Sequence, residues 1–424
     1  MATAVPEEYR EAFKSMLAAA APVAGFRTAY EAEAAISMLL GGVYAKAAPE
    51  ERRTLVTSVA DEFVKFLGRR HTPESLAILG GLAAVAPGVA GERAAKAVKR
   101  FEERGVMAPP WVTHTGKVSC TGAWRIFDMY GDKSHFVVTY RYDAPAVGGP
   151  DHAVTVLIDH NRRSVVDVAV ADPADDVVTG WARTLDQLTG AATMIEVPPG
   201  LARTMIEHHL PAAERMTEPP CGQRFLDIWA LVVSRVEALP FLPDAGPPPP
   251  VDEQGRATVV RAFLDTPVAG TLALEMATSV HDPISVVARA ARLIVDYAVE
   301  ANSGDPLRWS PTAVRHLMLE WAPRQRDLPP EVTTWLPDVL KAYVQFAGDL
   351  GNVPEEGILA TMKAVTDSTA RYQSLTVGSP EGESMEQIFD KMLDAGVDPA
   401  DDAAARQWLE RYVARQDGPG HDHR

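Results

Sequence analysis

The chain has 424 residues, of which 46% are hydrophobic and 23% charged, and its 57 acidic and 41 basic residues give a formal net charge of −16. The length exceeds what one core usually supports, so two or three domains are expected, and the composition excludes a disordered chain. The negative charge disfavours non-specific attraction to nucleic acid or anionic lipid, which leaves proteins or small molecules as the favoured partners.

The sequence predicts a cytoplasmic protein without a membrane span. The longest apolar stretch, residues 78–90, is interrupted by Gly80, Gly81 and Pro87, and falls short of the roughly 18 to 20 residues that a bilayer requires. The acidic residues Glu7 and Glu8 stand where a signal peptide needs basic ones. Cys120 and Cys221 have neither disulfide-framework nor metal-finger spacing, which is typical of reduced thiols.

Residues 1–109 predict a helical bundle, because apolar residues recur at three- and four-residue steps between helix-start signals. A capping residue followed by proline, as at Thr72 and Pro73, marks one such start. The expected helices begin at Pro6, at Thr28, at Pro49, at Pro73 and at Gly91.

Residues 110–190 predict a small antiparallel β module with a following helix. From Trp111 to Ala171 the apolar pattern alternates and is rich in β-branched and aromatic residues. The expected strands cover residues 124–127, 136–142, 154–160 and 165–171, and the helix covers 177–188.

The last two predicted strands allow a register to be derived. A three-residue loop at 161–163 places apolar side chains opposite one another, pairing Val154 with Val170, Val156 with Val168 and Ile158 with Val166. A four-residue loop would instead pair core positions with surface positions. The left-handed residue that such loops require would fall on Arg163 or a neighbour.

Helical periodicity returns after the sheet. Residues 191–246 form a helical segment, and the four prolines at 247–250 predict a stiff spacer before a helical C-terminal domain at 251–424. Its expected helices begin at or near prolines and cover 283–300, 311–321, 331–350 and 354–372. No fixed repeat supports a solenoid. The predicted fold class is therefore α+β and mostly α-helical.

Four segments carry a resemblance to a group of known sequences. They are PLRWSP at 306–311, LEWAPR at 319–324, LPDVLKAYVQF at 336–346 and HAVTVLIDHN at 152–161. Together they resemble uncharacterised actinobacterial proteins without an assigned activity. The resemblance implies an actinobacterial, cytosolic origin and transfers no catalytic residue.

Asp159 and Asp167 are the candidate catalytic residues. In the expected register they lie on the non-core face of the hairpin as diagonal neighbours, about 7 to 8 Å apart. Two carboxylates at that distance could act as general acid and base or hold a hard cation, and His160 could join them, with His135 and His152 in the same sheet. However, His152 and His160 occupy positions of the apolar face, whereas both aspartates lie on the other face. The simpler interpretation is that the aspartates are solvated edge charges that discourage pairing with another strand.

Other histidine patterns are weaker. Glu207, His208 and His209 fail as a metalloprotease motif, because adjacent histidines point about 100° apart on a helix, and a surface pair is favoured. The tail at 420–424 carries two histidines that could bind metal adventitiously. The sequence contains no phosphate-binding loop, nucleophile elbow or dinucleotide fingerprint.

Short basic clusters occur at 69–71, 96–100 and 162–163. They are scattered along the chain, so we expect them to assemble into one patch only if the domains fold back on each other.

The leading hypothesis is a non-enzymatic interaction or regulatory protein with a protein partner, without cofactor or bound metal, in an oligomeric state left open. One alternative is a metal-assisted enzyme that uses the carboxylate and histidine cluster. The second alternative, less favoured by the net charge, is a nucleic-acid-associated factor.

Overall fold

The computed structural model describes residues 7–187, 192–242, 251–325 and 328–376, together with the single positions 392, 393, 395, 397, 404 and 408. The proline stretch at 247–250 and the tail at 420–424 lie outside these residues. Contacts divide the chain into two units. The first unit comprises residues 1–254, 298–308 and 351–357, and the second comprises 255–297, 309–350 and 358–424.

The first unit begins with the predicted helical bundle. Its helices are α1 (Glu7–Ala20), α2 (Ala29–Tyr44), α3 (Arg52–Leu67), α4 (Pro73–Val85) and α5 (Val89–Glu103). Capping explains the starts of two of them, since Thr28 accepts a hydrogen bond from the Glu31 amide and Thr72 accepts one from the Ser75 amide. The expected order of helices is confirmed.

One antiparallel sheet follows the bundle. Its strands, in the spatial order β4-β3-β2-β1-β5, are β1 (Val118–Asp128), β2 (Lys133–Tyr142), β3 (His152–Asp159), β4 (Ser164–Ala171) and β5 (Ala192–Glu196). The four predicted strands and the predicted fold class are confirmed. Residues 191–246, predicted as a helical segment, also contain β5, an edge strand of only five residues that pairs with β1 and was not predicted.

The β3–β4 hairpin departs from the predicted register at its loop end. The inner pairs are confirmed, Val154 with Val170 and Val156 with Val168. Asp159 pairs with Ser164, so the loop has four residues and not three. Ile158 accordingly faces Val165, and the predicted pairing with Val166 is wrong.

A β-bulge reconciles the longer loop with an apolar core face. The register shifts between Leu157 and Ile158, which leaves Val166 as the extra residue of β4. Because of this extra residue, Ile158 and Val165 are both fully buried. The predicted left-handed residue is confirmed at Arg163, whose φ is 50°.

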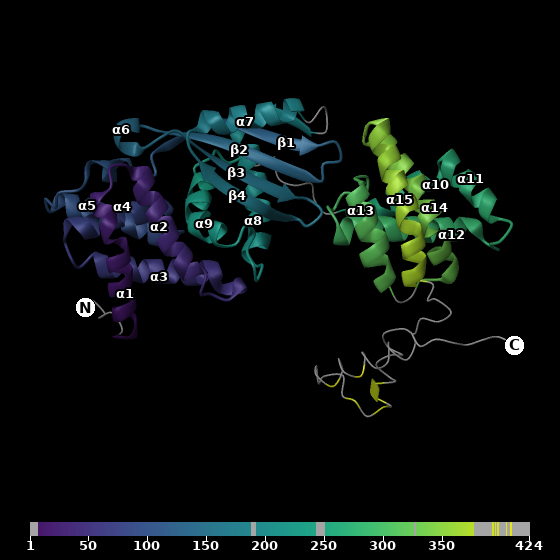
Figure 1. Cartoon of the computed structure of the whole chain (residues 1–424), viewed down its shortest axis with the longest axis horizontal. Coiled ribbons are helices and arrows are strands. Elements are labelled where there is room, and N and C mark those ends of the chain that lie inside the picture. The colour runs from purple at the N-terminus through teal and green to yellow at the C-terminus, as the bar shows by residue number, and fades with distance from the viewer. Residues whose placement is uncertain are drawn as a thin grey trace. The chain divides into compact units, whose positions relative to one another are not determined.

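Helices cover both faces of the sheet (Figure 1). Helix α7 (Ala174–Gln187) packs on one face, where Trp181 lies against Ile126 and Val137. Helices α8 (Pro199–Glu214) and α9 (Gln223–Glu237) pack on the other. The residues predicted as bundle, sheet and helical segment thus share a continuous core in the first unit.

A stripe of small and polar residues on α2 brings α9 close. Glu33, Ser37 and Gly41 recur every four residues and therefore lie on one face of the helix. The Ser37 hydroxyl donates to the carbonyl oxygen of Asp227 at 2.8 Å and accepts from the amide of Leu231 at 3.1 Å. Close approach of the two backbones is therefore built into the sequence of α2.

The second unit is helical. It contains most of α10 (Glu253–Leu264), α11 (Pro267–Met276), α12 (Pro283–Asp296), α13 (Pro311–His316), α14 (Pro330–Leu350) and α15 (Glu355–Thr376). Thr266, Asp282 and Ser310 each cap a helix whose first residue is proline. Helix α14 packs against α11 and α12, and its Tyr343 contacts Phe263 at a ring-centroid distance of 5.2 Å.

The length and apolar character of the described helices bear on whether one of them could span a membrane. None of them is by itself long and apolar enough to cross a bilayer. Helices α10 and α11 meet the length and composition criteria only as a pair, which is bent by 74°.

Candidate functional sites

The structure gives the two predicted carboxylates separate partners. Asp159 accepts hydrogen bonds from the amides of Asn161 and Arg162, at 2.9 and 3.2 Å, and so closes the hairpin loop. Asp167 accepts from the Cys221 thiol at 2.7 Å and also pairs with Arg224, both of which lie more than fifty residues later. Asp159 therefore stabilises the hairpin loop, and Asp167 ties β4 to the residues around the start of α9. The sequence did not indicate either role.

Cys221 is held at the start of α9. Its backbone is left-handed, with a φ of 58°, and its thiol points to Asp167. Burial raises the pKa of the thiol, and the neighbouring carboxylate raises it further. Such a thiol is a poor nucleophile at neutral pH because little thiolate forms.

His160 is a half-buried, neutral side chain. Its Nε2 atom lies 2.8 Å from the Ser134 hydroxyl, and its ring meets the ring of His209 edge-on at 5.4 Å. Burial, reinforced by the neighbouring His209, lowers the pKa of His160 to about 3. His160 thus contacts Ser134 and His209, whereas Asp159 and Asp167 bind other neighbours.

The predicted surface pair at 208 and 209 is wrong for one of its members. His208 is exposed, whereas His209 is buried and its Nδ1 atom lies 2.8 Å from the carbonyl oxygen of Met205. Among the described residues, no group of three or more histidine, cysteine, aspartate or glutamate side chains is arranged to hold a metal ion. The candidate metal site therefore gains no support.

A buried ion network joins the bundle to the sheet. One terminal nitrogen of Arg235, on α9, lies 2.5 Å from Glu33 Oε2 on α2 and 2.6 Å from the Tyr142 hydroxyl on β2. The Tyr142 hydroxyl donates to the same carboxylate oxygen at 2.8 Å. Arg235 Nε donates to His152 Nε2, on β3, at 2.9 Å. Four elements thus meet at one guanidinium group.

The two charges of this network form a fully buried ion pair, in which Nη1 of Arg235 has no hydrogen-bond partner among the described residues. Arg235 and Glu33 are both fully buried, and the second Glu33 oxygen accepts from the amide of Gly116 at 2.7 Å. Burial would lower the pKa of Arg235, but Glu33 and Tyr142 hold it above its ordinary value. The arrangement stabilises a charge in the core, which fits a structural role rather than turnover.

His152 completes the network as a neutral ring. Its Nδ1 atom lies 3.1 Å from the carbonyl oxygen of Pro150, so Nδ1 carries the proton and Nε2 accepts from Arg235. Burial, and then the charge of Arg235, lower its pKa to about 4. Strand parity places His152 on the core face, but no pattern in the sequence identifies Glu33, Tyr142 or Arg235 as its neighbours.

The two depressed histidine pKa values predict acid sensitivity. Below pH 6.5 an unfolded chain protonates His152 and His160, whereas the folded chain does not until about pH 4 and pH 3, so stability falls as the pH is lowered through this range. Each such proton contributes a slope of about 1.4 kcal/mol per pH unit. Urea unfolding of the His160→Asn variant should show a shallower slope between pH 6.5 and 4. The exposed His281→Asn variant is the control, and an equal slope in His160→Asn and wild type would contradict the assignment.

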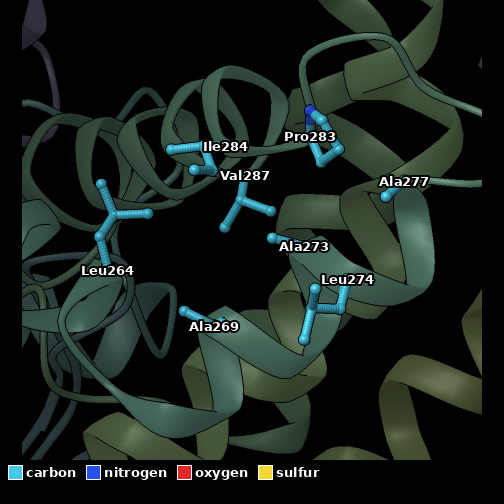
Figure 2. A pocket seen from close by; sticks show the side chains of 9 residues that line it. Leu264, Ala269, Ala273, Leu274, Ala277, Pro283, Ile284 and Val287 are labelled. Carbon is cyan, nitrogen blue, oxygen red and sulfur yellow. The ribbon is translucent and has the colours of Figure 1, made fainter.

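An apolar groove lies on the surface of the second unit (Figure 2). It has a volume of about 370 Å³ and is lined by α10, α11 and α12. The lining residues are uncharged: Leu264, Ala269, Gly270, Ala273, Leu274, Ala277, Pro283, Ile284 and Val287. Figure 2 shows Leu264, Ala273 and Val287 pointing toward the same space.

Two large side chains at this groove are left in solvent. Leu274 on α11 is 76% exposed and Ile284 on α12 is 67% exposed. The sequence analysis did not single out this groove, although α11 carries apolar residues around most of its circumference. Leu272 and Met276 are buried against the rest of the unit, so the apolar residues on the opposite face of α11, including Leu274, remain exposed.

The chain is a mostly α-helical α+β protein with a buried ion pair in the core of one unit and an open apolar groove in the other. Comparisons with family models, curated proteins and solved structures return no match to this chain. The resemblance to uncharacterised actinobacterial proteins therefore stays a prediction.

Proposed function

We propose that this chain is a non-enzymatic, cytoplasmic interaction protein whose second unit binds an amphipathic helix of a protein partner. The observation that carries the proposal is the groove between α10, α11 and α12, with Leu274 and Ile284 exposed beside it. Burying two such side chains contributes about 1.5 to 3 kcal/mol each.

The shape and chemistry of the groove favour a helical ligand. A volume of about 370 Å³ accommodates a few apolar side chains but not a folded domain. A helix that presents apolar residues at three- and four-residue steps would place them in such a groove in sequence. The exposed Glu275 on α11 and Arg289 on α12 supply charges of both signs close to the lining residues, which would orient a partner helix.

The enzymatic alternative has less support. Asp159 and Asp167 bind different neighbours, and His160 is bound to Ser134. A general acid and base must reach the same reacting group, and these three side chains do not share a partner.

Replacing Leu274 with aspartate should abolish partner binding and leave the fold intact. The side chain is mostly solvent-exposed, so its loss costs little stability, whereas a carboxylate would be buried without a partner in the complex. The probe is a displayed library of helical peptides selected on the wild-type chain. The affinity of the selected peptide, measured by fluorescence anisotropy, should fall at least about 100-fold.

The matched control is Leu359→Asp, because Leu359 is 56% exposed on α15 of the same unit and does not line the groove. Equal affinity of Leu274→Asp and wild type for the selected peptide would contradict the proposal. So would binding to phosphatidylcholine vesicles that Leu274→Asp abolishes, because the exposed face would then be a membrane contact.

A further inference from the structure

A second groove lies in the first unit between α3 and α5, and its lining is mostly basic, unlike the apolar groove of the second unit. It has a volume of about 650 Å³. Six basic side chains and one acidic side chain, Glu103, line it. The basic residues are Lys65, Arg69, Arg93, Lys96, Lys99 and Arg100.

This groove unites two basic clusters that are separate in sequence. The cluster at 69–71 follows α3 and the cluster at 96–100 lies on α5, and the packing of these two helices brings Arg69 and Arg100 to one surface. The expectation concerned the assembly of all three basic clusters; the first two meet within one helical bundle, because α3 packs on α5. The third cluster, at 162–163, does not line the groove.

The basic residues of α5 form a row. Arg93, Lys96 and Arg100 follow one another at three- and four-residue steps, so they share a face of the helix. At 1.5 Å of rise per residue the row is about 10 Å long. Successive phosphates of a nucleic-acid strand could each meet one cation along such a row.

The cations of the groove are only partly neutralised within the protein. Lys65 and Arg93 both pair with Asp61, at 2.8 and 2.6 Å. Lys65 also pairs with Glu62 at 2.5 Å, and the exposed Lys96 lies 3.9 Å from Glu92. Lys99 and Arg100 are exposed and form no ion pair with any described carboxylate. A local excess of positive charge therefore persists on a chain whose net charge is −16.

We infer that this groove binds the sugar-phosphate backbone of a single-stranded nucleic acid. It is concave, which fits a strand better than the plane of a lipid surface. Its apolar lining is confined to the buried Val64 and to Gly68, so an acidic peptide would find no pocket for an anchoring side chain. No aromatic side chain lines it, so binding is through phosphates and without sequence preference.

The electrostatic origin of binding sets its salt dependence. Lys99, Arg100 and the weakly paired Lys96 can neutralise about three phosphates of a strand, which gives a slope of log affinity against log salt of about −2. Binding should therefore be measurable at about 50 mM salt and weaken steeply above it. This inference is independent of the proposed function, which concerns the second unit.

The test is fluorescence anisotropy of labelled oligothymidylate and oligouridylate with the full chain. The double variant Lys99→Gln/Arg100→Gln should lose at least 10-fold in affinity and show a shallower salt slope. The control variant Lys363→Gln/Arg371→Gln makes the same change of charge on exposed residues of α15, and should bind as the wild type does.

Three results would overturn the inference. The first is no binding of either oligonucleotide at low salt, and the second is an equal loss in both double variants, which would show diffuse charge attraction. The third is binding of polyglutamate or of phosphatidylserine vesicles, but not of oligonucleotide, that depends on Lys99 and Arg100.

Discussion

Replacing Arg235 with methionine is expected to lower the free energy of unfolding of the first unit by about 3 to 5 kcal/mol. Methionine roughly preserves the volume of the side chain but leaves the Glu33 carboxylate buried without its cation. It also removes the donor to His152 Nε2. Urea unfolding followed by tryptophan fluorescence measures the loss.

The double variant Glu33→Gln/Arg235→Met separates charge from packing. A neutral amide at position 33 still accepts from the Gly116 amide and no longer carries an unpaired charge. The double variant should therefore be more stable than Arg235→Met alone. An Arg235→Met variant destabilised by less than about 1 kcal/mol would show that Glu33 does not depend on Arg235 for its burial.

Replacing Gly41 with alanine should destabilise the same unit by about 3 kcal/mol. A methyl group at this position would lie 2.1 Å from the carbonyl oxygen of Leu226, so α2 and α9 would have to separate. Backbone atoms cannot yield as a flexible side chain does. Thermal and urea unfolding of the purified variant give the size of the effect.

The neighbouring Gly42 provides the control. A methyl group there meets no atom within 4 Å, and alanine is favoured over glycine inside a helix by about 0.5 to 1 kcal/mol. Gly42→Ala should therefore stabilise the protein while Gly41→Ala destabilises it. Effects of the same sign would contradict the described packing of α2 on α9.

Local signals made most of the helices and strands predictable. A capping residue before proline marked the start of α4, prolines marked the starts of α12 and α13, and the change to alternating apolar residues marked β1 to β4. These features depend on neighbours in sequence. Strand β5 has five residues and little burial, so no comparable signal identified it.

Features that depend on distant contacts could not be predicted. The bulge at Val166 is a compromise between loop length and burial, and the sequence analysis treated the two as alternatives. Asp167 binds Cys221 and Arg224, which lie at the start of α9. Strand geometry could not show these partners, and it therefore made Asp167 look available for catalysis.

The charged residues of the core were missed for a related reason. Glu33 and Arg235 each stand within an apolar helical face, which is a signal for a buried ion pair, but only the structure shows that the two residues meet. The basic clusters at 69–71 and 96–100 likewise required the packing of α3 on α5 before they formed one groove.

Hydrogen–deuterium exchange with and without the selected helical peptide tests the central claim most directly. Protection confined to the segments of α10, α11 and α12 around Leu264, Leu274 and Ile284 is the predicted result. Protection centred on α3, on the sheet or on α15, with these segments unchanged, would contradict the assignment of the groove as the partner-binding surface.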